Sequence, residues 1–188
     1  MTVTVESLLV GAGRASGAVA VIDVFRAFTT AAVALANGAS RIIMVGSVEE
    51  ALALRDSGEV QACMGEVRGV APPQFDFGNS PFEVSVRSFR GAVVAQRTSA
   101  GTQGVVAARG AAALYAASLM TASSTAAALR AAGTDGITLV SMGHEGTERT
   151  DEDELCALHL RNLIEGRPGD PDAVRRVIMA GGEAAPLP

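Results

Sequence analysis

Short apolar segments of strand length alternate with helix-like segments along nearly the whole chain. This alternation is typical of βαβ units, in which helices connect parallel strands and cover their sheet. The run Ala18–Val24 is apolar except for Asp23, which indicates a strand buried on both faces. We therefore predict an α/β fold of one domain over residues 1–188, a three-layer α/β/α sandwich with a largely parallel or mixed central sheet. Strands are expected at 18–24, 41–45, 61–65, 92–96, 111–119 and 137–142.

Capping signals indicate where several helices begin. Ser47 is followed three residues later by Glu50, the pattern of a capping box, and this helix is expected to run to about residue 57. Ser80, Pro81 and Glu83 predict another helix start, with an N-cap, a proline at the first helical position and a reciprocal glutamate. Further helices are expected at 27–37, 103–108 and 123–132, from Thr150 onward, and from Asp170-Pro171 to Gly181-Gly182.

Charge and composition argue against several classes of protein. A net charge of −5 and a pI near 5.0 do not suit nucleic-acid binding, which depends on basic patches. No apolar run approaches the ~18 residues of a membrane span. Residues 1–6 lack the basic stretch that opens a signal peptide. Cys63 and Cys156 lie in apolar segments, so two buried thiols are expected in a cytoplasmic protein, in preference to a disulfide or a reactive thiol.

Polar side chains follow four of the expected strands. Because ligands bind beyond the carboxyl ends of parallel strands, these side chains are expected to meet at one edge of the sheet. Carboxylates, arginines and hydroxyls that converge from separate strands indicate a binding site. The residues are Asp23 and Arg26; Glu66 and Arg68; Arg97, Thr98 and Ser99; and His144, Glu145 and Asp153.

Each of these features also has a simpler interpretation. Asp23 can be a helix cap as well as a ligand, and single arginines often pair with carboxylates on a solvated rim. The turn at 98–102 has the composition of an anion-binding helix start, but Ser, Gly and Thr are common at any helix start. The acidic run 151–154 is typical of a first helical turn stabilised by the helix dipole. His144 and His159 are assigned no role.

Together these residue types match the chemistry of a phosphate ester. The negative oxygens of such an ester repel a nucleophile, and arginines, helix N-termini and a divalent cation neutralise that charge. The chain has no lysine, so every cationic contact to a phosphate must come from an arginine. Mg²⁺ prefers carboxylate and water oxygens, which suits a chain with two histidines and no evident zinc ligand set.

Several stretches, taken in order, carry a family resemblance. They are Val21–Ala27, Gly65–Gly69, Phe75–Pro81, Gly101-Thr102 and Glu152-Asp153, and Phe-Asp-Phe-Gly-Asn-Ser-Pro at 75–81 is the most distinctive. On these motifs the sequence resembles the 2-phosphosulfolactate phosphatase family, Mg²⁺-dependent enzymes first associated with coenzyme M biosynthesis. The resemblance covers most of the chain and implies an α/β/α fold. It also implies hydrolysis of a phosphate ester in a substrate that carries a neighbouring sulfonate group.

The resemblance also implies roles for individual residues. The catalytic set is Asp23, Glu66, Asp76 and Asp153, of which Asp23, Glu66 and Asp153 are expected to bind Mg²⁺. The expected nucleophile is either a carboxylate or a metal-bound water. The substrate contacts that the resemblance implies are Arg26, Arg68, Asn79, Ser80, Gly101 and Thr102. The strand-end pattern adds Arg97, Thr98 and Ser99, with backbone N–H donors from the turn at 99–102. The partner is a small phosphorylated anion, and a homodimer is compatible with a small α/β enzyme.

Two departures from the family pattern keep other functions open. Ala100 stands where relatives often carry an amide side chain, and the chain ends sooner after the helix of Asp153 than relatives do. One alternative is therefore a non-catalytic anion-binding or regulatory homologue. Another is a phosphatase for a different phosphorylated carboxylic acid, because family names extend to homologues with other substrates.

Overall fold

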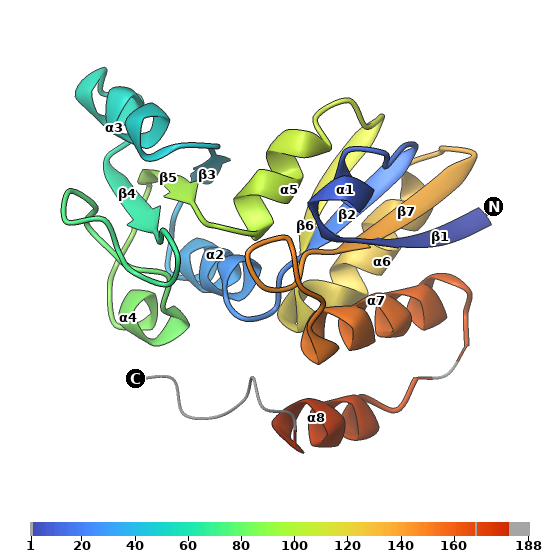
Figure 1. Cartoon of the computed structure of the whole chain (residues 1–188). Coiled ribbons are helices and arrows are strands. Elements are labelled where there is room, and N and C mark those ends of the chain that lie inside the picture. The colour runs from blue at the N-terminus through green and yellow to red at the C-terminus, as the bar shows by residue number, and fades with distance from the viewer. Residues whose placement is uncertain (1, 168, 181–188) are drawn as a thin grey trace.

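The computed structural model describes residues 2–167 and 169–180, and in these ranges the chain forms two parallel β-sheets with surrounding helices (Figure 1). The strands are β1 Thr2–Ser7, β2 Ala18–Ile22, β3 Arg41–Met44, β4 Ala62–Gly65, β5 Val93–Arg97, β6 Ala113–Ala117 and β7 Gly136–Ser141. The helices are α1 Leu8–Ala12, α2 Ala27–Ala36, α3 Val48–Asp56, α4 Pro81–Ser85, α5 Gly101–Ala107, α6 Ala122–Ala131, α7 Asp151–Ile164 and α8 Pro171–Ala180, with the 3₁₀ helix η1 Leu119–Thr121.

The larger sheet has the strand order β1-β7-β2-β6 and the smaller sheet has the order β3-β5-β4. Every pair of neighbouring strands is parallel. β2 lies between β7 and β6 and is buried at every position, as its continuous apolar run predicts. Parallel pairing directs the carboxyl ends of all strands in a sheet to the same edge, where polar residues follow.

The division into two sheets differs from the single central sheet that we expected, whereas the α/β class and the parallel strands are confirmed. α2 carries the chain from β2 to β3, and α5 carries it back from β5 to β6. Both helices pack against strands of both sheets, and Figure 1 shows them between the two. Because the helices fill this space, the strands of one sheet cannot hydrogen-bond to those of the other.

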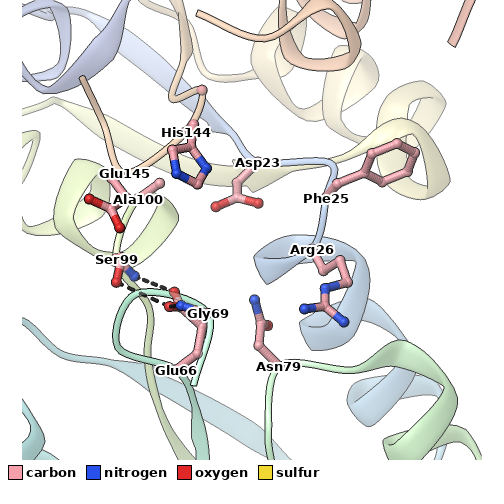
Figure 2. A pocket seen from close by; sticks show the side chains of 11 residues that line it. Asp23, Phe25, Arg26, Glu66, Gly69, Asn79, Ser99, Ala100, His144 and Glu145 are labelled. Atoms are coloured by element: carbon pink, nitrogen blue, oxygen red, sulfur yellow. Dashed lines mark hydrogen bonds between the residues drawn. The ribbon is translucent and has the colours of Figure 1, made fainter. Parts of the chain in front are cut away.

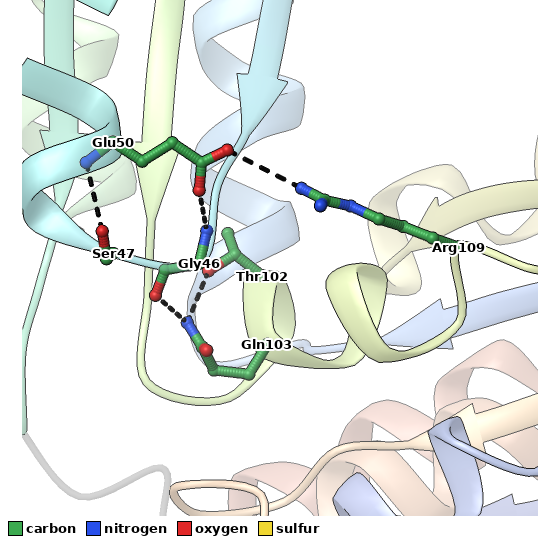
Figure 3. A network of polar contacts seen from close by, with 6 residues as sticks. All are labelled: Gly46, Ser47, Glu50, Thr102, Gln103 and Arg109. Atoms are coloured by element: carbon green, nitrogen blue, oxygen red, sulfur yellow. Dashed lines mark hydrogen bonds and ion pairs between the residues drawn. The ribbon is translucent and has the colours of Figure 1, made fainter. Parts of the chain in front are cut away.

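A polar network joins the smaller sheet to α5 (Figure 3). The Gln103 side-chain amide donates to the Gly46 carbonyl at 3.0 Å and to the Thr98 carbonyl at 3.0 Å. Glu50 accepts from the Gly46 N–H at 3.0 Å and lies 3.8 Å from the Arg109 guanidinium. The loop after β3 is therefore fixed to the helix that starts at the carboxyl end of β5.

The predicted capping boxes are only half correct. The Ser80 hydroxyl caps α4 by accepting from the Glu83 N–H at 3.3 Å, as predicted. The Glu83 carboxylate accepts from the Gly78 N–H at 2.9 Å instead of returning to the N-cap. In α3, Glu50 likewise accepts from the residue before its N-cap. In both cases the preceding loop brings an earlier amide to the carboxylate.

Other helix starts also differ in detail from the prediction. The capping box before α6 is made by Ser118 and Thr121 around η1, and α6 begins at Ala122, one residue before its predicted start. Thr150 occupies the N-cap position of α7, but its hydroxyl makes no capping bond to any described residue. α8 starts as predicted with Asp170 as its cap, which accepts from the N–H of residue 173 at 3.0 Å, and its predicted end at 181–182 lies outside the described residues.

The N-terminal β1 and α1 were not predicted. β1 lies at the edge of the larger sheet, beside β7, and none of its six residues is fully buried, so it carries little apolar signal. Both cysteines are free and buried, as expected. Across residues 2–167 and 169–180, no helix has the length and apolar character to cross a membrane.

Candidate functional site

A cavity of about 230 Å³ lies where the carboxyl ends of the two sheets meet (Figure 2). It is lined by residues that follow β2 and β7 of the larger sheet and β4 and β5 of the smaller one. The predicted convergence is therefore real, but it joins the edges of two sheets instead of one. The lining residues are Asp23, Phe25, Arg26, Glu66, Gly69, Asn79, Ser99, Ala100, Gly143, His144 and Glu145.

Asp23 joins the starts of two helices at the cavity wall. Its Oδ1 accepts from the Ala27 N–H and its Oδ2 from the Gly101 N–H, both at 2.9 Å. Burial raises the pKa of this carboxyl to about 6, and the negative charges of Glu66 and Glu152 add to the rise, against the two backbone hydrogen bonds. Asp23 is thus a cap for both helices and also a cavity-lining carboxylate, so it combines the two roles that the sequence left open.

The contact between Asp23 and Gly101 requires a glycine. A Cβ at this position would lie 2.8 Å from the Asp23 Oδ2 and 3.0 Å from both the Ala27 Cβ and the Phe28 Cζ. The N-cap of α5 is Ala100, which has no capping side chain of its own. Asp23 supplies the missing acceptor from the larger sheet, which explains how alanine is accommodated here.

Glu66 connects the end of β4 to the turn after β5. Its Oε1 accepts from the Ser99 N–H at 2.5 Å, and its Oε2 accepts from the Gly69 N–H at 2.6 Å and from the Ser99 hydroxyl at 3.1 Å. The carboxylate is held in place while it faces the cavity (Figure 2). The Arg97 guanidinium supports the same junction by donating to the Glu66 carbonyl at 2.8 Å.

Arg26 and Asn79 line the cavity with unpaired polar groups. The Arg26 guanidinium makes no ion pair or hydrogen bond with any residue that the structure describes. The Asn79 Oδ1 is buried and has no partner in the same part of the chain. Figure 2 shows both side chains pointing into the space below Asp23. Such groups favour a bound ligand, because a buried polar atom without a partner is costly.

Two of the three predicted substrate-binding arginines do not line the cavity. Arg68 contacts the site through its backbone N–H, which donates to the Ser99 hydroxyl at 2.9 Å, while the residue is exposed to solvent. The Arg97 guanidinium bonds to the Glu66 carbonyl and to the Ser99 hydroxyl, so it holds the loops together. Only Arg26 has its guanidinium in the cavity among the predicted arginines.

Several predicted polar residues have structural contacts. The Asp76 carboxylate accepts from the Cys63 N–H at 2.8 Å and lies outside the cavity, which does not support its catalytic assignment. Thr98 and Thr102 are buried and exchange backbone and hydroxyl hydrogen bonds across the start of α5. Ser80 caps α4. These residues shape the site without facing it.

The predicted N–H donors of the 99–102 turn are already paired. The Ser99 N–H donates to Glu66 and the Gly101 N–H donates to Asp23. The Thr102 N–H donates to the Thr98 hydroxyl. The turn therefore orients protein carboxylates, and it does not offer these three donors to an anion.

Asp153 is buried beside the cavity but does not line it. Its Oδ1 accepts from the Val24 N–H and its Oδ2 from the Gly143 N–H, both at 2.8 Å. Burial raises the pKa of Asp153 well above its usual value, and the charge of Asp23 adds to the rise. Asp153 thus ties the carboxyl end of β2 to that of β7, and its expected place as a third metal ligand is not supported by this geometry.

His144 and Glu145 lie in the cavity wall although His144 was assigned no role. They belong to a tight turn after β7, in which the His144 N–H donates to the Glu148 carbonyl at 2.7 Å. Glu145 has a φ of 51°, and a Cβ on Gly143 would clash with the Glu148 carbonyl. The glycines that flank the His-Glu pair at a strand end are the sequence signal that could have identified this turn.

The carboxylates that face the cavity suit a two-ligand cation site. Within the described part of the chain, no group of three or more His, Cys, Asp or Glu side chains is placed to hold a metal. Asp23 and Glu66 both line the cavity, and the negative charge of Glu66 contributes to the raised pKa of Asp23. Mg²⁺ is commonly bound by one or two carboxylates together with substrate oxygens and water. The donor set therefore fits Mg²⁺ through Asp23 and Glu66, without Asp153.

Comparison with known proteins gives the family of the chain. The profile of the 2-phosphosulpholactate phosphatase family matches residues 5–179. The chain belongs to this family. A probable 2-phosphosulfolactate phosphatase of Thermus thermophilus is 38% identical over 174 residues, which cover 90% of this chain and 71% of that protein.

Two further members of the 2-phosphosulpholactate phosphatase family show how far the similarity extends. The probable 2-phosphosulfolactate phosphatase of Bacillus subtilis is 32% identical over 148 residues, or 78% of this chain and 63% of that protein. That of Thermoplasma acidophilum is 29% identical over 183 residues, or 92% of this chain and 81% of that protein. The family resemblance drawn from the motifs is thus confirmed, and the chain spans less than two thirds of the Bacillus protein.

Proposed function

We propose that this chain is a Mg²⁺-dependent phosphatase that hydrolyses the phosphate monoester of a small anionic acid, with 2-phosphosulfolactate as the first candidate substrate. The observation that carries the proposal is the cavity in which the unpaired Arg26 guanidinium lies with the carboxylates of Asp23 and Glu66. This combination binds an anion and a cation side by side. The name of the family supports a phosphoric monoester as the anion.

Asp23 and Glu66 would hold Mg²⁺, which neutralises phosphate charge and polarises oxygens bound to it. Each carboxylate is fixed by at least two donors from the protein, so it need not reorganise when a ligand binds. The burial that raises the pKa of Asp23 makes its lone negative charge unfavourable, and a bound cation would offset that cost.

Arg26 and Asn79 would bind and orient the anionic substrate. Arginine presents a planar set of donors that matches phosphate or sulfonate oxygens, and it stays charged throughout the working pH range. The Asn79 amide provides a donor and the unpaired Oδ1 acceptor. A cavity of about 230 Å³ suits a substrate of few heavy atoms and does not suit a polymer.

Two further expectations belong with this proposal. Buried, free thiols suit a reducing compartment, so the cytoplasm remains the expected location. A homodimer remains a prediction, which a sedimentation measurement would test.

Phosphate release from a panel of substrates, measured in excess Mg²⁺ and in EDTA, tests the proposed function. The panel contains 2-phosphosulfolactate, a phosphorylated carboxylic acid such as 2-phosphoglycolate, and p-nitrophenyl phosphate. We expect Mg²⁺-dependent release that is fastest with a doubly anionic ester. Phosphate release from only one of the other esters would make that ester the proposed substrate in place of 2-phosphosulfolactate. Binding of an ester without any phosphate release would favour the non-catalytic homologue that Ala100 suggests.

A further inference from the structure

His144 is a cavity residue to which the proposed function assigns no role so far. It follows the carboxyl end of β7, and its imidazole enters the cavity from the side of Asp23 (Figure 2). The side chain makes no hydrogen bond or ion pair with any residue in the ranges that the structure describes. Its backbone, in contrast, is held by several bonds.

The turn that carries His144 is anchored at three points. The His144 N–H and carbonyl both bond to Glu148, at 2.7 and 3.1 Å. The Gly143 N–H donates to the buried carboxylate of Asp153 at 2.8 Å. The Gly146 carbonyl accepts from the Leu9 N–H at 3.0 Å, which connects the turn to α1. A fixed backbone with a free imidazole is the arrangement that a residue acting on a ligand needs.

Most other polar groups in the cavity are poorly suited to give a proton to a ligand. Asp23 and Glu66 are the proposed ligands of Mg²⁺, and a carboxylate that binds the cation does not carry a proton to give. Arg26 stays charged, and an amide such as Asn79 is not an acid. The Ser99 hydroxyl donates to Glu66. His144 and Glu145 remain, and histidine is the side chain that most often transfers protons in catalysis.

We propose that His144 is the catalytic residue that protonates the leaving oxygen of the phosphate ester, an inference that rests on the proposed function. In hydrolysis, an oxygen of water forms the new bond to phosphorus and the ester P–O bond breaks. Its electron pair goes to the alcohol oxygen, which takes the proton of the imidazole. The proton released by the attacking water returns through solvent to the imidazole. The products are the free alcohol and inorganic phosphate.

A pair of substrates that differ in one atom tests this role. The ester that the wild-type enzyme turns over best is compared with its analogue in which sulfur replaces the bridging oxygen. A thiolate leaves without a proton, so the sulfur analogue does not need an acid. We expect His144→Gln to lower kcat on the oxygen ester by roughly 100-fold or more and to lower it on the sulfur analogue by only about threefold. The exposed position of His144 means that the variant should fold.

Control variants separate the possible outcomes. Glu145→Gln is the matched neighbour in the same turn, and His159→Gln changes the other histidine, in α7 outside this cavity. An equal loss on both substrates in His144→Gln would overturn the proposal, as would the selective loss appearing in Glu145→Gln instead. Wild-type enzyme that releases no phosphate from either ester would refute the proposed function itself, which is a different result.

Discussion

At the residue scale, two buried aspartates with similar surroundings have different roles. Asp23 and Asp153 each accept two backbone N–H bonds, and burial raises the pKa of both. Only Asp23 also faces the cavity. The sequence identified both as site residues because each follows a strand end, but sequence position does not reveal which way a carboxylate points. The same limit applies to Arg68, Arg97 and Asp76.

The raised pKa of Asp23 predicts a dependence of stability on pH. Between pH 3.8 and about 6 the folded protein binds a proton that the unfolded chain does not, so the free energy of unfolding falls as pH rises through this window. The loss should be on the order of 1–3 kcal/mol. Denaturant titrations of the Mg²⁺-free protein at pH 4.5 and 7 measure it.

In Asp23→Asn this pH slope should shrink, and added Mg²⁺ should stabilise the wild type more at pH 7 than at pH 4.5. The slope that remains comes from Asp153, whose pKa is raised in the same direction. An unchanged slope in Asp23→Asn would show that Asp23 does not titrate in this range.

The close approach at Gly101 predicts a costly substitution. Gly101→Ala places a Cβ 2.8 Å from the Asp23 Oδ2, so α5 or the carboxylate must move. We expect a loss of about 1–3 kcal/mol in the free energy of unfolding, together with reduced activity. Gly110→Ala is the matched control, because its Cβ would meet nothing within 4 Å. Equal stability of the two variants, measured by denaturant midpoint, would contradict the tight packing.

At the scale of the elements, helix starts were predicted better than the partners of their capping side chains. Ser80 and Pro81 open α4 as expected, because an N-cap followed by proline is a local pattern. The acceptor for the Gly101 N–H comes from Asp23, 78 residues away, and no local pattern reveals it. The edge strand β1 was missed because none of its residues is fully buried and few of them are apolar.

Asp153→Asn tests whether this residue joins two strand ends or binds metal. The asparagine keeps one acceptor, and its amide nitrogen faces an N–H donor of Val24 or Gly143, so we expect a loss of about 1–3 kcal/mol in stability. Activity should fall because the His144 turn loses an anchor. The Mg²⁺ concentration for half-maximal activity should stay near the wild-type value. A large increase in that concentration would instead make Asp153 a metal ligand.

Ser80→Ala tests a cap that is separate from the cavity. Loss of the hydroxyl that accepts from the Glu83 N–H should lower the free energy of unfolding by ~1 kcal/mol. Because Ser80 does not line the cavity, kcat should remain within about twofold of the wild-type value. A twofold change corresponds to ~0.5 kcal/mol, the size of effect that a substitution away from a functional site usually has. A large loss of activity in a fully stable variant would restore Ser80 to the substrate contacts.

At the scale of the whole molecule, the site depends on the division into two sheets. The sequence pattern predicts strands, but it does not specify which strands pair across long connections. β2 and β3 are neighbours in the chain, yet α2 and α5 separate their sheets. The resulting cavity combines Asp23 and His144 from the larger sheet with Glu66, Asn79 and Ser99 from loops of the smaller one. The convergence of strand ends was predictable, whereas the two-sheet geometry was not.

The most direct test of a phosphate-ester site in this cavity is kcat/KM for phosphate release from 2-phosphosulfolactate in Arg26→Met, with Arg68→Met as its control. Arg26 has the unpaired guanidinium in the cavity, and Arg68 contacts the site through its backbone. Loss of a bidentate, charge-assisted contact predicts a decrease of roughly tenfold to several hundredfold for Arg26→Met. Arg68→Met should stay within about threefold of the wild type, since no buried contact is lost. Equal effects of the two substitutions, or Mg²⁺-independent release by the wild type, would contradict the account.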